Sequence, residues 1–339
     1  MEKIGVVVIG RNEGARLGAC LASVSSQAGR IVYVDSGSTD DSLGIAASHQ
    51  ANIVSLDDSR PFTAARARNE GFSRLLKLSP DCVGVQFVDG DCRVSDGWLS
   101  AAVRVLAARP EVAVVCGNCR EQFPDRSVYN MLCDMDWNGP AGDTTWCGGN
   151  ALMRVAALRE AKGFNAALIA GEELELCVRL RQLGYKIHRL DAEMVRHDAA
   201  MTRFSQWWKR TRRTGHAYAE GALLFRKSDE RFCAKESRSA IFWGMLLPLL
   251  FCFCLLLGFW AGPLAVAGGC IPFIYLVQLA RIYRSRRVLG DDARASATYA
   301  SFCILGKLPQ GLGVCLFHFN RTLGKRTSLL EYKTARRAE

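Results

Sequence analysis

Residues 83–92 read Val-Gly-Val-Gln-Phe-Val-Asp-Gly-Asp-Cys, an apolar run that ends in two carboxylates separated by one glycine. Such a run is typical of a strand that is buried on both faces. Asp89 and Asp91 then lie at the carboxyl end of that strand, the edge where open α/β sheets bind their ligands. Carboxylate oxygens suit Mg²⁺ or Mn²⁺, although turn chemistry alone also explains an Asp at such a junction. The pair is therefore a candidate metal site whose meaning depends on the rest of the chain.

The residues before this strand repeat the same pattern. Residues 4–9 and 31–34 are apolar runs rich in β-branched residues, and each is followed by a polar loop and a helical apolar stripe. This order favours a parallel sheet with right-handed crossovers. The loops place Glu13 and Asp35 at the edge that carries the Asp pair. Neither loop contains Gly-x-Gly-x-x-Gly and the chain has no Walker loop, so a Rossmann dehydrogenase and a P-loop enzyme lose their main support.

Two arginines stand at the start of the helix predicted before the Asp pair. They belong to Ala-Arg-Ala-Arg-Asn at residues 65–69. A positive side chain at a helix N-terminus opposes the helix dipole, so an anion bound there explains the placement. A solvated helix face is the alternative on this segment alone.

Four segments in order resemble the family 2 glycosyltransferases, whose nucleotide-sugar-binding domain has the GT-A fold. They are Val-Ile-Gly-Arg-Asn-Glu (8–13), Val-Asp-Ser-Gly-Ser-Thr-Asp (34–40), Ala-Arg-Ala-Arg-Asn (65–69) and Val-Asp-Gly-Asp (88–91). The resemblance covers roughly residues 4–215. It implies an α/β domain, mostly a parallel sheet flanked by helices, that transfers a sugar from a nucleotide-diphosphate sugar with Mg²⁺ or Mn²⁺.

The resemblance also implies roles for individual side chains. Glu13 and Asp35 would hold the nucleoside, and the arginines would lie near the diphosphate. Asp89 would face the ribose or the sugar. The implied donor-binding residues are Arg11, Glu13, Asp35, Arg66, Arg68, Asn69 and Asp89, and the implied metal ligands are Asp91 and His197.

A downstream helix supplies the expected catalytic base. Residues 147–154 resemble the glycine-containing acceptor segment of the family, and residues 171–180 resemble its Glu-Asp helix. The present chain has Glu172-Glu173 there, so the matching base is Glu173, with Glu172 as the alternative. A carboxylate at this point takes the proton of the acceptor hydroxyl, and direct attack inverts the anomeric centre. An ordinary amphipathic helix surface is the other interpretation of this segment.

Two further departures concern the nucleotide pocket. Ser36 stands where the family often has a second Asp, and Gly10 precedes Arg11 where other residues are common. They leave the base of the nucleotide open. His197 resembles a family histidine that contacts metal or diphosphate, but a lone histidine is also explained by ordinary hydrogen bonding.

The charge of the chain is concentrated in its C-terminal part. The chain of 339 residues has a net charge of +11, yet residues 1–200 carry 22 Lys and Arg against 25 Asp and Glu. Residues 201–339 carry 22 against 8, and these cations flank long apolar runs. This pattern is typical of a membrane protein at anionic headgroups, so nucleic acid is not expected as a partner.

The apolar runs predict a transmembrane helical hairpin. Residues 240–262 and 263–280 are uncharged and predict spans at about 240–262 and 263–282. Basic residues precede the first span and follow the second, and none stands between them, which places both ends of the hairpin in the cytoplasm. Two buried core helices are the alternative. A third stretch, near 295–320, is interrupted by Lys307 and Pro309 and is predicted to be interfacial or re-entrant.

These features predict two regions. Residues 1–225 form a cytoplasmic catalytic domain with an interfacial helix near 203–225, and residues 226–339 form the membrane region with a basic tail. The N-terminus carries no signal peptide, and the 14 cysteines show no zinc spacing, which fits a reducing compartment.

The expected function is that of an inverting glycosyltransferase at the inner (plasma) membrane with several spans. Its acceptor is expected to be a lipid-linked glycan, because an anchor beside the active site raises the local concentration of a lipid. A synthase that charges polyprenyl phosphate with a sugar is one alternative. A catalytically silent membrane scaffold that binds nucleotide sugar or a partner protein is the other.

Overall fold

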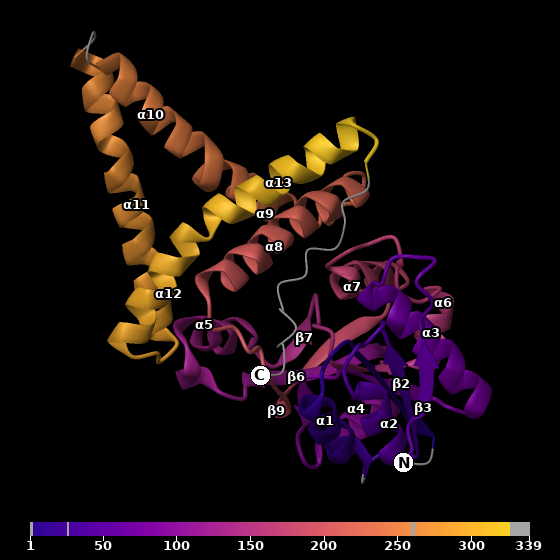
Figure 1. Cartoon of the computed structure of the whole chain (residues 1–339). Coiled ribbons are helices and arrows are strands. Elements are labelled where there is room, and N and C mark those ends of the chain that lie inside the picture. The colour runs from indigo at the N-terminus through magenta and orange to yellow at the C-terminus, as the bar shows by residue number, and fades with distance from the viewer. Residues whose placement is uncertain (1–2, 26, 259–261, 326–339) are drawn as a thin grey trace. The chain divides into compact units, whose positions relative to one another are not determined.

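The structure is a computed structural model that describes residues 3–25, 27–258 and 262–325 (Figure 1). The described chain divides after Thr202 into two compact units. The first unit contains the whole sheet and the second is helical. The basic tail predicted after residue 325 lies outside the described residues.

The sheet of the first unit has the strand order β3-β2-β1-β4-β8-β6-β9-β5, and β7 pairs with β9. Its strands are β1 (Ile4–Gly10), β2 (Arg30–Asp35), β3 (Asn52–Ser55), β4 (Gly84–Asp89), β5 (Cys92–Val94), β6 (Val112–Glu121), β7 (Gly142–Thr144), β8 (Ala151–Arg154) and β9 (Lys186–His197). Strands β1 to β4 are parallel. The continuous apolar runs of β1, β2 and β4 predict this, whereas β3 was not predicted. Antiparallel β8 then separates β4 from β6, so the complete sheet is mixed.

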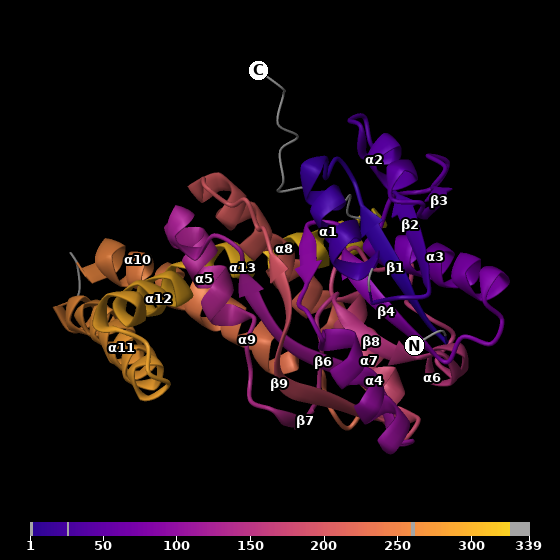
Figure 2. The ribbon, with the colours of Figure 1, turned by 90° about the horizontal axis from the view of Figure 1, so that it is seen from below.

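Helices cover both faces of this sheet (Figure 2). They are α1 (Ala15–Ser25), α2 (Ser42–Ser48), α3 (Ala64–Leu78), α4 (Trp98–Ala108), α5 (Val128–Asp136), α6 (Val155–Glu160) and α7 (Glu172–Gln182), with the short 3₁₀ helix η1 (Pro124–Arg126) before α5. The predicted α/β architecture is therefore confirmed.

The pleat of the strands sends alternate residues to different helices. Gly71 of α3 packs so closely on Val7 of β1 that an added Cβ would lie 2.4 Å from a Val7 methyl carbon. On the other face of the sheet, Ile4 of β1 and Leu106 of α4 both lie close to Gly84. Because side chains alternate along a strand, α3 and α4 cover opposite faces. This sandwich accounts for the burial of β1, whose full contact with apolar neighbours stabilises the fold by about 1.5–3 kcal/mol per large side chain.

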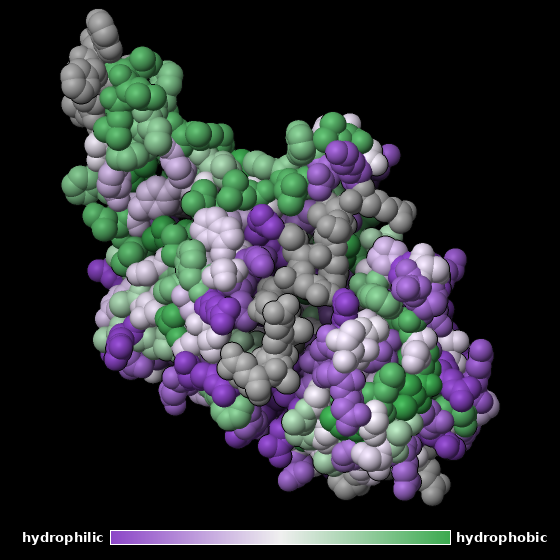
Figure 3. All heavy atoms as spheres, in the orientation of Figure 1, coloured by the Kyte–Doolittle hydropathy of each residue, from purple (hydrophilic) through white to green (hydrophobic). Residues whose placement is uncertain are grey.

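The second unit consists of long helices. They are α8 (Phe204–Leu224), α9 (Ala234–Ile241), the π-helical turn η2 (Phe242–Leu246), α10 (Leu247–Gly258), α11 (Gly262–Val288), α12 (Ala293–Leu305) and α13 (Lys307–Thr322). Large apolar side chains of α10 and α11 face outward, for example Leu256 with 74% exposure and Phe273 with 69% (Figure 3). Exposed apolar surface of this extent fits a lipid environment better than water.

Two helical stretches are long and apolar enough to cross a membrane, Ala234–Leu257 and Ala293–Thr322. The first agrees with the first predicted span. Helix α11 contains the second predicted span, although the side chains of residues 262–267 lie outside the described residues. The second stretch, Ala293–Thr322, covers the segment predicted to be interfacial or re-entrant. The number and orientation of the spans, and the interfacial role of the segment now seen as α8, stay predictions.

Glycines of α13 let the other helices approach its backbone. An added Cβ at Gly313 would lie 2.1 Å from the carbonyl oxygen of Arg212 in α8, and one at Gly311 would lie 3.0 Å from that of Ala240. From the other side, a Cβ at Gly215 would lie 2.0 Å from the carbonyl oxygen of Gln310. Small residues at helix crossings are the usual means of close packing in apolar surroundings.

Candidate active site

The carboxyl ends of three parallel strands bring the predicted acidic residues to one edge of the sheet. In the β1–β2 pairing Gly10 lies opposite Asp35, and in the β1–β4 pairing Ile9 lies opposite Asp89. Glu13 follows β1 directly, and its Cγ would lie 3.3 Å from a Cβ added at Gly90. The shared edge follows from parallel pairing alone, which is why the sequence could predict it.

Arg68 contacts three carboxylates that belong to two other elements. Its Nη2 donates to Asp89 Oδ1 at the end of β4 over 2.9 Å. Its Nη1 donates to Glu172 Oε1 over 2.7 Å and forms an ion pair with Glu173 Oε1 over 2.9 Å, both at the start of α7. The Arg68 side chain is only 3% exposed. Three acids around one buried cation leave a surplus of negative charge in this cluster.

The surplus charge alters the proton affinity of Glu173. Burial raises its pKa first, the Glu172 carboxylate raises it further, and Arg68 opposes them, so that the pKa of Glu173 is raised from 4.5 to about 7. The side chain keeps 15% of its surface exposed, so solvent or an acceptor still reaches it. A carboxylate with a pKa near neutrality is suited to accept a proton and to release it again.

Gly149 is the point at which the backbone approaches this cluster. An added Cβ would lie 2.3 Å from Arg68 Nη2, 2.9 Å from Asp89 Oδ2 and 3.1 Å from Glu173 Oε1. The preceding Gly148 has no heavy atom within 4 Å of such a Cβ. The next residue, Asn150, accepts a hydrogen bond from the backbone N–H of Asp89 over 3.0 Å. The glycine segment therefore fixes the end of β4 and leaves space beside Glu173.

A second cluster adjoins the first at the β4–β5 turn. Potential ligand atoms of Asp91, Cys92 and His197 lie within 4.8 Å of one another, and His197 Nε2 is 3.2 Å from Asp91 Oδ2. Burial raises the pKa of the Cys92 thiol well above its usual value, and Asn150 donates to its sulfur. Sulfur is also a soft ligand, which suits a hard cation poorly. The carboxylate and the imidazole remain, and this donor pair fits Mn²⁺ or Mg²⁺.

Two side chains lie beside the imidazole of His197. Glu121 Oε2 lies 3.9 Å from His197 Nδ1, and the indole of Trp137 meets the ring edge to face at 4.6 Å between centroids. Glu121 is itself fixed, because its carboxylate accepts hydrogen bonds from Asn130 Nδ2 and from the backbone N–H of Ala199. Glu121 thus borders His197 at the ring nitrogen remote from Asp91.

Asp35 binds its own loop at this edge. Its carboxylate accepts hydrogen bonds from the hydroxyl of Tyr33 and from the backbone N–H groups of Gly37 and Ser38, over 2.9–3.0 Å. The positive φ of Gly37, 78°, makes this tight turn possible. Asp35 thus shapes the loop that follows β2.

Other predicted donor-site residues are held by neighbouring groups. Glu13 pairs with Arg16 over 2.7 Å, and the guanidinium of Arg11 lies 5.5 Å from the centre of the Phe62 ring. Arg66 binds the carbonyls of Asp57 and Arg60, and Asn69 binds the backbone of Phe164 in both directions; these contacts are hydrogen bonds of 2.8–2.9 Å. Arg66 and Asn69 thus stabilise loops, whereas Arg68 alone of this segment enters the acidic cluster.

The family models agree with this geometry. Residues 5–161 match the model of glycosyl transferase family 2, and residues 84–283 match that of glycosyl transferase family group 2, which spans more than half of the chain. The chain is a family 2 glycosyltransferase. The predicted family and enzyme class are confirmed, and the interpretation as a catalytically silent scaffold loses its support.

Solved structures share the fold of this family 2 glycosyltransferase. The mannosyltransferase PcManGT from Pyrobaculum calidifontis, in complex with GDP-Man and Mn²⁺, matches with a TM-score of 0.57 and 17% identity over 91% of this chain and 87% of that chain. TarS from S. aureus (residues 1–349) matches with 0.48 and 14% identity over 95% and 92%. Glucosyl-3-phosphoglycerate synthase from Mycobacterium tuberculosis, with Mn²⁺ and UDP, matches with 0.41 and 19% over 57% and 71%. The first comparison confirms the GT-A fold.

The sequence does not identify every residue of this site. The Cys-Gly-Gly-Asn segment resembles the family, but the different surroundings of Gly148 and Gly149 depend on the fold. Glu121 and Trp137 carried no sequence signal at all, because each stands in an element whose residue pattern is that of a normal strand or helix.

Proposed function

We propose that this family 2 glycosyltransferase inverts the anomeric centre while it transfers a sugar from a nucleotide-diphosphate sugar to a lipid-linked glycan at the membrane. The observation that carries the proposal is Glu173, a carboxylate with a pKa near 7 that stays partly exposed beside Arg68. Arg68 joins it to Asp89, which lies on the shared edge of β1, β2 and β4, and this supports a role next to the donor.

In the proposed reaction Glu173 acts as the general base. Its ionised carboxylate takes the proton of the acceptor hydroxyl while that oxygen forms a bond to the anomeric carbon. The bond between this carbon and the diphosphate oxygen breaks, and the nucleoside diphosphate leaves with the electron pair. Arg68 holds Glu173 and Asp89 in place during this step. The proton on Glu173 returns to solvent afterwards.

A divalent cation is proposed at Asp91 and His197. When bound there, it would neutralise negative charge on the leaving diphosphate. The donor chemistry is supported by the close approach of the two side chains. Mn²⁺ in the complex of the similar mannosyltransferase named above is consistent with it. The donor-binding roles of Arg11, Glu13, Asp35 and Asp89 at the same edge belong to the same proposal.

The membrane part of the proposal concerns the acceptor. Two stretches in the second unit have the length and composition of spans, and basic residues flank them. A catalytic unit at the cytoplasmic face of the inner membrane would meet its acceptor in the bilayer, where anchoring raises the local concentration. The donor sugar and the nucleotide base are to be identified with a panel of nucleotide sugars.

The test is a panel of UDP-, GDP- and dTDP-sugars with Mn²⁺ or Mg²⁺ and a membrane lipid extract. Release of nucleotide is measured for wild type, Asp91→Asn and the control Asp96→Asn, which changes an exposed acid outside the cluster. We expect release with one donor class that Asp91→Asn removes and Asp96→Asn keeps. Absence of any release that depends on metal and on Asp91 would overturn the proposal.

A second variant separates the two acceptor classes. With a sugar hydroxyl as acceptor, Glu173→Ala abolishes transfer because no group takes the proton. With polyprenyl phosphate as acceptor the attacking oxygen is already ionised, and the same variant retains most activity. Retained transfer would therefore replace the glycan acceptor by polyprenyl phosphate.

A further inference from the structure

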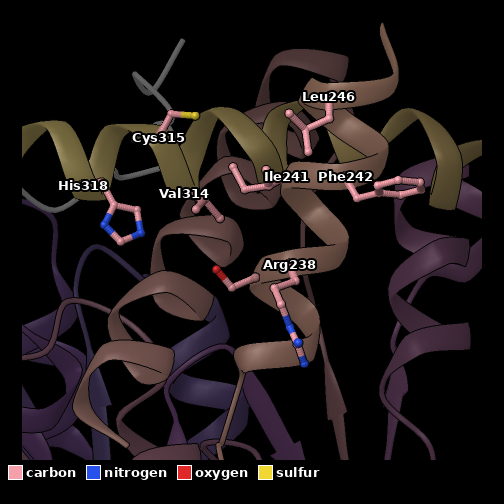
Figure 4. Close-up of a pocket in the computed structure, with 8 residues that line it drawn as sticks. Arg238, Ile241, Phe242, Leu246, Val314, Cys315 and His318 are labelled. Atoms are coloured by element: carbon pink, nitrogen blue, oxygen red, sulfur yellow. The ribbon is translucent and has the colours of Figure 1, made fainter. Parts of the chain in front are cut away.

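The second unit contains a groove between α9, η2 and α13. Its volume is about 620 Å³ and its lining is mainly apolar (Figure 4). The lining residues are Ser237, Arg238, Ile241, Phe242, Leu246, Val314, Cys315 and His318. None of them belongs to the candidate active site.

The antiparallel course of the two walls sorts the lining by polarity. Gly244 of η2 packs on the carbonyl of Lys307, and Gly311 packs on that of Ala240. The two walls therefore run antiparallel to each other. The same order brings Arg238 and His318 to one end of the groove. In Figure 4 both side chains point to the same side of α13. The polar groups are therefore gathered, and the remaining lining is hydrocarbon.

Charge is partitioned along these walls in the same way. Residues 239–258 and 308–317 contain no Asp, Glu, Lys or Arg. Lys235 lies one turn before Arg238 on α9, and Arg321 lies one turn after His318 on α13. Helix α9 has a single acidic residue, Glu236, whose electrostatic influence falls on Cys233 and Lys307. The polar end is thus basic and the long side is uncharged.

The basic end offers donors to an anion. Arg238 Nε donates to the carbonyl of Ala234 over 3.2 Å, which holds the side chain along α9. Among the described residues, its terminal guanidinium nitrogens have no hydrogen-bond partner, and neither have the ring nitrogens of His318. A guanidinium is well suited to phosphate oxygens.

The wall of the groove also departs from regular helix. In η2 the N–H of Leu247 bonds the carbonyl of Phe242, five residues back, and the hydroxyl of Tyr275 donates to the carbonyl of Trp243. A π-helical turn is rare and is found most often at functional positions. Here it gives Phe242 and Leu246 their places on the groove.

We propose that this groove binds a lipid phosphate, with the phosphate at Ser237, Arg238 and His318 and the hydrocarbon chain along Ile241, Phe242, Leu246 and Val314. The proposal rests on the membrane location proposed above, but on no feature of the catalytic cluster. It assigns a lipid ligand to the second unit irrespective of which sugar is transferred.

The test measures direct binding to the full-length protein in phosphatidylcholine nanodiscs. Radiolabelled geranylgeranyl phosphate is the probe, and geranylgeraniol and inorganic phosphate are the competitors. We expect saturable binding that excess geranylgeraniol or inorganic phosphate displaces only weakly. If geranylgeraniol competes as well as geranylgeranyl phosphate does, the binding is general apolar partitioning. If inorganic phosphate competes as well, the groove binds free anions and not a lipid. Either result overturns the proposal.

Three variants locate the site. Arg238→Gln should weaken binding about tenfold, because a charged hydrogen bond to the phosphate is lost. Leu246→Trp should fill the groove and lower the bound amount, whereas Leu249→Trp, on an exposed position of α10 outside the groove, should not. Unchanged binding in both Arg238→Gln and Leu246→Trp would overturn the assignment, as would a lipid-free dimer that covers the groove.

These measurements are independent of the proposed reaction. The nucleotide release that depends on Asp91 is recorded on the same samples and serves as the check of folding for each groove variant. Lipid binding without any nucleotide release would leave the groove assigned and contradict only the catalytic proposal. Nucleotide release without lipid binding would support the catalytic proposal and contradict the assignment of the groove.

Discussion

Arg68 Nη1 lies 2.9 Å from Glu173 Oε1, and the same nitrogen lies 2.7 Å from Glu172 Oε1. One buried guanidinium nitrogen thus holds both candidates for the catalytic base. The two acids differ in access, because Glu172 is 5% exposed and Glu173 is 15% exposed. Their roles can therefore be separated by substitution.

Glu173→Gln should lower the rate of transfer by about 10²–10⁴-fold, because the amide cannot take the proton of the acceptor. Donor affinity should change little, since Gln keeps the size and one acceptor oxygen. Steady-state kinetics and a donor-binding titration measure the two effects. The matched control is Glu172→Gln, which should keep more activity; the opposite order would assign the base to Glu172.

The pH dependence should follow Glu173. Its pKa is raised to about 7, and only the ionised form acts as a base, so kcat/KM should rise with pH through about 7 and then level off. The profile of wild type is compared with that of Glu173→Asp. A profile that is flat between about pH 5.5 and 8.5 would contradict the assignment.

The same group should destabilise the folded protein at high pH. A folded-state pKa above the unfolded value means that stability is fully present below about pH 4.5 and is lost as pH rises through about 7. Glu173→Gln should therefore raise the free energy of unfolding at about pH 8.5 by an amount on the order of 2 kcal/mol, and leave it unchanged at about pH 4.5. Thermal unfolding at both values checks this.

Metal binding should depend on Asp91. Asp91→Asn should weaken Mn²⁺ binding by at least about 100-fold, and Glu121→Gln, which removes the negative charge beside the remote ring nitrogen of His197, by about 10-fold. Mn²⁺ titrations followed by electron paramagnetic resonance measure both, with Asp96→Asn as the control. Chelation by EDTA should stop transfer, and added Mn²⁺ should restore it. Equal affinity in wild type and Asp91→Asn would place the metal elsewhere.

The neighbouring glycines Gly148 and Gly149 provide a matched pair. Gly149→Ala would place a methyl group 2.3 Å from Arg68 Nη2, so the cluster must shift and activity should fall at least about tenfold. Gly148→Ala meets nothing within 4 Å and should keep near wild-type activity. A similar loss in both variants would show that the loop, and not contact with Arg68, is responsible.

Helix packing in the second unit should depend on Gly215. Gly215→Ala would bring a Cβ within 2.0 Å of a backbone oxygen in α13, which should cost about 1–3 kcal/mol. Gly269→Ala meets nothing within 4 Å and should be neutral or slightly stabilising, because alanine favours helix. Thermal unfolding in detergent compares the two.

Much of the first unit could be predicted because its signals are local. A continuous apolar run such as residues 4–9 predicts a strand covered on both faces, and parallel pairing then brings Asp35 and Asp89 to one edge. The antiparallel insertion of β8 between β4 and β6 could not be predicted in this way. Its four residues carry no signal for their partners, which lie far away in the chain.

The sequence by itself determined the family, the strands now seen as β1, β2 and β4 with the helices between them, and the apolar character of the second unit. Each of these depends on residue type and spacing. Only the tertiary structure decided that Arg68 and not Arg66 enters the acidic cluster, and that Gly149 and not Gly148 lies against it. The reason is physical: side chains two residues apart on a helix, or neighbours in a loop, point in different directions, and the elements that they meet are set by long-range packing.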